Sequence, residues 1–167
     1  MSTQNMTQPT IALFVTMAVN AWETYNKRVD SLIAKLSEEQ LGAQTAPDRN
    51  TGTYLLGHLT AVSDGMRPLM GLGDRLYPEL EAIFITSPDG AGLEKPSLET
   101  LKQNWVAVND SLRNSFGEMD PEEWFERHTA VSEEDFAKEP TRNKLNILLS
   151  RTSHQSYHMG QRAYLNR

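Results

Sequence analysis

The stretch LSRTSHQSYHMGQR, residues 149–162, carries two of the four histidines of the chain, His154 and His158, and contains no proline. Four residues correspond to one helical turn plus about 40° of rotation, so both imidazoles leave the same side of a helix. Two ligands of one metal ion need this spacing, although such pairs also occur by chance on solvated helix faces. The stretch therefore predicts a helix and motivates the search for a third ligand.

Outside this stretch, apolar residues recur every three or four positions, which is the period of an amphipathic helix. Four long helices are expected over residues 10–36, 55–69, 98–117 and from 142 almost to the C-terminus. Pro68 would kink or end the second helix, while Ser97 and Thr141 would cap the third and the last. The apolar stripe expected for the first helix consists of Phe14, Ala18, Ala21, Tyr25, Val29, Leu32 and Leu36.

The connections between these helices contain only short elements. Turns are expected within LSEEQLG (36–42), YPELEAIF (77–84) and DPEEWFERH (120–128), and the one strand candidate, AIFIT (82–86), has no partner. The connection of residues 71–96 can cross the length of a bundle, which allows the second and third helices to run parallel. We therefore predict an all-α fold, a four-helix bundle in up-down-down-up order with this long connection between helices 2 and 3. A simple up-and-down order is the alternative.

Length and composition restrict the kind of protein. With 167 residues, 38% of them hydrophobic, the chain predicts one domain over residues 1–167, in which residues 1–9 are expected to be flexible. The absence of cysteine removes disulfides and thiolate ligands, so any metal must be held by histidine, carboxylate or water. A net charge of −6 argues against nucleic-acid binding, and no apolar run is long enough to span a membrane. We expect a cytoplasmic protein with a small molecule or a protein as its partner.

His58 is the candidate for the third ligand. On the second helix it lies within about 60° of the centre of the apolar stripe, so it should face the interior. A neutral core histidine bonded to a carbonyl or hydroxyl is the alternative. His154 and His158 lie away from the main apolar stripe of the last helix, which would then be apolar on two sides. One side would pack on its own bundle or on a second subunit, and the other would line a pocket.

Two motifs tie these residues together: LLGHL, residues 55–59, and SRTSHQSYHMGQ, residues 150–161. With LSEEQL after the first helix and four helices in this order, the sequence resembles the DinB-like family of metalloenzymes, which includes the YfiT-type proteins. The resemblance implies that His58, His154 and His158 are the metal ligands. It also implies a four-helix bundle, often a homodimer, that binds zinc or nickel and has no other cofactor. Three imidazoles suit such metals better than Mg²⁺ or Ca²⁺, which prefer oxygen.

The resemblance also suggests an activity. The best understood relatives are thiol transferases, which attach bacillithiol or mycothiol to electrophiles, and a mycothiol-dependent isomerase. Metal-dependent hydrolysis is one alternative, and a non-catalytic dimeric bundle with a structural metal is another. A role in DNA damage is suggested only by the family name, and the acidic charge opposes it. The sequence offers no carboxylate at a spacing typical of a general base.

Other polar residues are candidates for supporting the site. Gln161 could contact a ligand histidine or the substrate, and Arg151 could bind an anionic group of a substrate. Alternatively, Gln161 is an ordinary polar residue near a helix end, and Arg151 is a solvated surface arginine. The remaining candidates for a hydrogen bond to a ligand or for a place in the pocket are Asp48, Asn50, Tyr54, His128, Ser150 and Tyr157.

Overall fold

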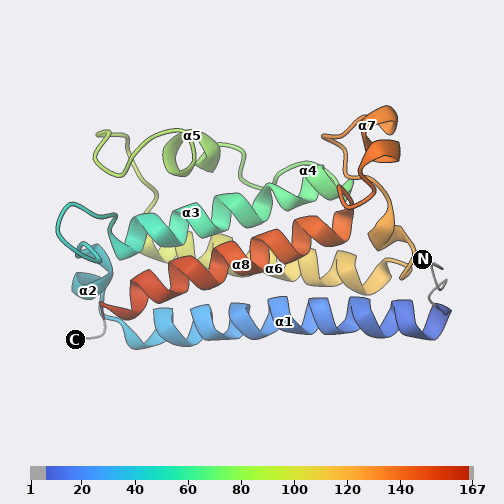
Figure 1. Ribbon diagram of the computed structural model, residues 1–167. Helices are drawn as coiled ribbons and strands as arrows, with labels where there is room; N and C mark the ends of the chain where they lie inside the picture. The colour runs from blue at the N-terminus through green and yellow to red at the C-terminus, as the bar shows by residue number, and fades with distance from the viewer. Residues whose placement is uncertain (1–6, 166–167) are drawn as a thin grey trace.

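The computed structural model describes residues 7–165, in which helices dominate and no β-strand occurs (Figure 1). The long helices are α1 (Gln8–Lys35), α3 (Gly52–Asp64) with its continuation α4 (Met66–Met70), α6 (Leu98–Glu118) and α8 (Lys144–Ala163). The short ones are α2 (Glu38–Gly42), α5 (Leu80–Phe84), the 3₁₀ helix η1 (Glu123–Phe125) and α7 (Glu133–Lys138). The prediction of an all-α fold is confirmed.

Contacts between side chains fix the direction of the long helices. Trp105 Nε1 donates to Asp30 Oδ1 over 2.7 Å, and Arg113 pairs with Glu23 over 3.2 Å, so α1 and α6 are antiparallel. In Figure 1, α3 and α6 both run away from the end at which α1 finishes, and α8 returns toward that end. The long connection between α4 and α6 carries α5 along the outside of α3.

The core lies between these four helices and is divided by a polar layer. One apolar cluster contains Trp22 and Trp124, and a second contains Trp105. All three tryptophans are buried, as expected for packing residues. Between the clusters Gln155 Nε2 of α8 donates to Asn26 Oδ1 of α1 over 2.7 Å, and both side chains are buried. A buried polar pair of this kind favours one register between two helices, because any shift leaves both groups unpaired.

The stripe expected for α1 is partly wrong. Phe14 is 45% exposed, whereas Val15, Trp22 and Asn26 are buried. The true inner face includes Asn26, which is polar but pairs with Gln155. Because a hydropathy pattern counts asparagine as an outside residue, it rotates the predicted face toward the exposed apolar side chains.

Pro68 does not end the second long helix. The break comes earlier, at Gly65, where the Asp64 carboxylate accepts the backbone N–H groups of Leu76 and Tyr77 over 2.9 Å. Pro68 then lies in the first turn of α4, where a missing N–H group costs no intrahelical hydrogen bond.

Two further local predictions need correction. The cap of α8 is Asn143 rather than Thr141, because Asn143 Oδ1 accepts the N–H of Asn146 over 2.9 Å. Helix α7 was not predicted, although Ser132 caps it by accepting the N–H of Asp135. The short turns within 36–42, 77–84 and 120–128 are confirmed as α2, α5 and η1.

The N-terminal segment that was expected to be flexible lies only partly within the described structure. Of the nine residues expected to be flexible, 1–6 lie outside the described part of the chain, and α1 includes Gln8 and Pro9. Among residues 7–165, no helix has the length and apolar character required to cross a membrane.

Candidate metal centre

His58 is held in place by the packing of α5 on α3. Phe84 of α5 is fully buried and its ring lies directly against Gly57, where any larger residue would overlap it. This close approach brings the carbonyl oxygen of Phe84 to 2.7 Å from His58 Nδ1. The carbonyl can only accept, so Nδ1 donates its hydrogen and Nε2 carries the lone pair. The fold therefore fixes both the orientation and the tautomer of His58.

His154 and His158 meet His58 from α8. His154 Nε2 lies 3.2 Å from His58 Nε2 and 3.0 Å from His158 Nε2. Gln161 Oε1 lies 2.7 Å from His158 Nδ1 and accepts its hydrogen, which turns the Nε2 lone pair of His158 toward the other two rings. The predicted trio of histidines is thus brought together, with ligand atoms all within 4.8 Å of one another.

This donor set fits a divalent metal. Since His58 and His158 both point a lone pair inward, His154 can donate a hydrogen to only one of them, and a proton network cannot satisfy all three atoms. A tetrahedral ion with bonds of about 2.0–2.1 Å would place its nitrogen ligands about 3.3 Å apart, close to the observed separations. The outer nitrogen of His154, Nδ1, is buried and has no partner. Three imidazole nitrogens suit zinc, nickel or cobalt.

The surroundings of His154 and His158 favour the neutral imidazole, which is the form that binds metal. Burial, together with the neighbouring His158, His58 and Arg151, lowers the pKa of His154 to about 4. Burial also lowers the pKa of His158, against the opposing effect of its bond to Gln161. At neutral pH these two residues therefore need not release a proton before they coordinate.

Comparison with known proteins agrees with this geometry. The DinB superfamily matches residues 21–161 of the chain, a range that includes all three histidines. The chain belongs to the DinB superfamily. A crystal structure described as the conserved protein of locus from Enterococcus faecalis resembles it, with a TM-score of 0.63 and 16% sequence identity. That likeness covers 91% of this chain and 94% of the other, and at this identity it shows the fold alone. No curated protein matches the chain.

The histidine cluster of this DinB-superfamily protein borders a cavity of about 500 Å³. His58 and His154 form part of its wall, and Arg151 lines it from α8. Two more charged residues in the wall, Arg75 and Glu81, were not predicted from the sequence. They come from the connection between α4 and α6, which has no helical period to indicate which side chains turn inward. The cavity is large enough for a small organic molecule.

The other candidate residues have different positions. The Tyr54 hydroxyl donates to the carbonyl of Ser87 over 2.6 Å, and its ring stacks parallel to that of His58 with centroids 6.4 Å apart. Tyr157 is 64% exposed and its hydroxyl accepts from Gln161 Nε2 over 3.2 Å. Asp48 and Asn50 line a separate polar cavity, Ser150 is exposed, and His128 lies in the loop beside Arg142.

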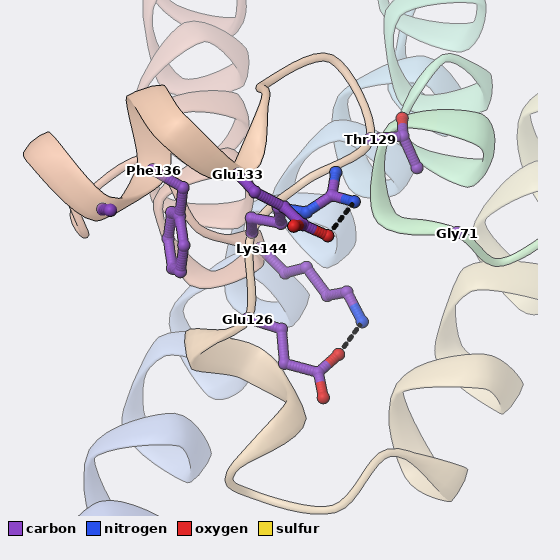
Figure 2. A pocket seen from close by; sticks show the side chains of 8 residues that line it. Gly71, Glu126, Thr129, Glu133, Phe136 and Lys144 are labelled. Atoms are coloured by element: carbon purple, nitrogen blue, oxygen red, sulfur yellow. Dashed lines mark hydrogen bonds and ion pairs between the residues drawn. The ribbon is translucent and has the colours of Figure 1, made fainter.

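A second cavity, of about 540 Å³, lies between the end of α4 and α7 (Figure 2). Its charged side chains are paired: Lys144 with Glu126 over 2.8 Å and Arg127 with Glu133 over 3.6 Å. Every charge on this wall therefore has a partner already.

Proposed function

We propose that this protein is a metal-dependent enzyme that transfers a low-molecular-weight thiol, of the bacillithiol or mycothiol type, to a small electrophile. Zinc or nickel would be held by His58, His154 and His158. The observation that supports this proposal is the convergence of three oriented lone pairs beside a cavity of about 500 Å³. Within residues 7–165 the cluster has three ligand side chains and no fourth, a number typical of catalytic rather than structural sites.

The chain supplies orientation, and the metal supplies acidity. A divalent metal bound here would lower the pKa of a thiol or water molecule that binds to it, so that this group loses its proton near neutral pH. The Phe84 carbonyl holds the ring of His58 in one tautomer, and Gln161 does the same for His158, so both rings are oriented before the substrate binds. Because the chain contains no cysteine, no thiol of its own competes for the site.

Metal-dependent hydrolysis is the second candidate function. It is favoured by Glu81, a carboxylate in the cavity wall that can accept a proton from an attacking water. Glu81 is engaged with Arg75 over 3.3 Å, and its side chain is 47% exposed, so it stays accessible to substrate. A structural metal in a non-catalytic dimer is the third candidate.

We also propose a cytoplasmic homodimer built from an up-down-down-up bundle. The exposed apolar side chains Leu13, Phe14 and Met17 on one face of α1 support association with a second copy. The antiparallel contacts of α1 with α6 support the helix order.

The test is metal content by inductively coupled plasma mass spectrometry on untagged protein, with His58→Ala, His154→Ala and the control His128→Ala. We expect about one zinc or nickel per chain in the wild type and the control, and none in the two cluster variants. Metal retained by His154→Ala would overturn the site. The loaded wild type should then consume a thiol in the presence of a chromogenic electrophile. Ester cleavage without thiol consumption would favour the hydrolase, and neither reaction would favour the structural metal.

A further inference from the structure

Two arginines reach the same cavity as the histidine cluster. Arg151 lies on α8 one turn before His154, and Arg75 comes from the connection that follows α4. Arg75 is fixed, since Nη1 donates to the carbonyl of Ala61 over 3.0 Å and Nη2 pairs with Glu81 over 3.3 Å. With two guanidinium groups and one carboxylate, Glu81, among its lining residues, this cavity has a net positive lining.

Arg151 differs from Arg75 because it has no acidic partner. Its Nε is buried without a hydrogen bond, and in the described part of the chain its guanidinium makes no ion pair. Burial, and next the charge of Arg75, lower the pKa of Arg151. A half-buried arginine of this kind lacks the anion that would satisfy it.

The other residues that line the cavity indicate what kind of molecule would supply this anion. The charged side chains of the wall are Arg75, Arg151 and Glu81, so two positive charges and one negative charge leave a net charge of +1. The other lining residues are largely apolar: Ala61, Val62, Pro68, Leu69 and Ile85. Since Arg75 already pairs with Glu81, Arg151 carries the charge without a partner, and a fitting ligand has an apolar body and an anionic group for Arg151. The planar fork of Arg151 matches the two oxygens of a carboxylate.

We propose that the substrate of this site is a small organic carboxylate, whose carboxylate binds Arg151 beside Arg75 and whose apolar body lies in the cavity next to the histidines. The inference rests on the proposed function, which makes the molecule in this cavity a substrate. Arg151 is the residue that determines its specificity. Arg75, restrained by Glu81, sets the position of the second positive charge.

Isothermal titration calorimetry with three probes of one chain length tests the proposal. The probes are hexanoate, hexanamide and hexyl phosphate, added to the protein as purified and after removal of metal with a chelator. We expect hexanoate to bind in both forms and at least tenfold more tightly than hexanamide. Equal binding of hexanamide would overturn the proposal, and tighter binding of hexyl phosphate would overturn the assignment to a carboxylate.

Variants show where the carboxylate binds. Arg151→Gln should weaken hexanoate binding at least tenfold, Arg151→Lys should weaken it less, and the surface control Arg113→Gln should leave it unchanged. Arg151→Gln should also melt at the wild-type temperature or above, because it removes an unpaired, half-buried charge. Hexanoate binding that survives in Arg151→Gln but disappears with the metal would place the carboxylate on the metal and overturn the proposal.

Metal content measured on the same samples separates the two proposals. Failure of the chain to bind metal, with hexanoate binding still dependent on Arg151, would overturn the proposed enzyme and leave the carboxylate site. Normal metal content without hexanoate binding would overturn the carboxylate site and leave the proposed enzyme.

Discussion

Replacing Arg162 with methionine should stabilise this protein. The side chain of Arg162 lies on α8 and is fully buried, with 0% exposure. Its Nε, Nη1 and Nη2 atoms have no hydrogen-bond partner. Burial lowers the pKa of Arg162 from its usual value to about 10. A charged group in this position opposes folding, because the unfolded chain solvates it fully.

The magnitude follows from this pKa. A pKa of about 10 lies well below that of a solvated arginine, and at about 1.4 kcal/mol per pH unit the difference corresponds to a cost on the order of 3 kcal/mol. The pKa of this base is lower in the folded state, so the unfolded state binds the proton more tightly. The cost is therefore fully present below pH 10, including pH 7. Methionine keeps the unbranched apolar stem and removes the charge, so Arg162→Met should gain about 3 kcal/mol, or about 6–12 °C in melting temperature.

Urea unfolding at pH 7, followed by circular dichroism, measures this gain. Arg28→Met is the matched control, because Arg28 is exposed on α1 and its replacement should change the free energy of unfolding by less than about 0.5 kcal/mol. A loss of stability in Arg162→Met would refute the reasoning. It would mean that the guanidinium finds a partner, such as a bound anion or ordered water, that is worth more than the cost of burial.

Three further predictions concern the support of the site and the stability of the fold. Gln161→Leu removes the acceptor of the His158 N–H group and should weaken zinc binding about 10–100-fold in a competition with a chelator, whereas unchanged affinity would remove Gln161 from the site. Gly57→Ala should cost about 1–3 kcal/mol in urea and also weaken zinc binding, because its methyl group overlaps the Phe84 ring; a neutral result would show that the ring can move freely. Asp89→Asn should cost about 1 kcal/mol at pH 7, since Asp89 accepts a backbone N–H at the start of α3 over 2.7 Å. Burial raises the pKa of Asp89, but the ion pair with Lys95 and the hydrogen bonds from Thr51 outweigh it and hold the pKa below its usual 3.8. The cost of Asp89→Asn should therefore persist at neutral pH and disappear as unfolding is measured below about pH 4, and a cost that did not change with pH would refute the contribution of the charged carboxylate.

The clustering of the three histidines could be predicted from the sequence because they lie on periodic elements. His154 and His158 are four residues apart on one helix, and His58 is placed by the apolar period of another. The histidine pair alone could be a chance pair on a solvated helix face, and His58 alone could be a neutral core histidine. Only the combination of both features with the family motifs indicates that the three histidines form one site. The partner of His158, Gln161, is on the same helix and was accessible to the same reasoning.

The part of the cavity wall that comes from the connection between α4 and α6 could not be predicted, because tertiary contacts decide it. Arg75 and Glu81 belong to a connection whose path depends on Asp64, which binds the backbone of residues 76 and 77. Phe84 then anchors this connection on α3, and its carbonyl becomes the partner of His58. None of these contacts produces a periodic pattern in the sequence. The error in the inner face of α1 has the same origin, since Asn26 is buried only because another helix supplies its partner.

The four nitrogen-rich side chains of α8 form one stripe, and this arrangement bears on what the centre prefers to bind. At about 100° per residue, positions 151, 154, 158 and 162 fall within an arc of about 80°. Arg151 and Arg162 therefore lie on either side of the histidine pair, and their charges lower the pKa values of His154 and His158 respectively. The same charges oppose a divalent cation and favour any ligand that brings negative charge with it. A metal ion held between two uncompensated arginines would thus be better suited to a thiolate or a carboxylate than to neutral ligands.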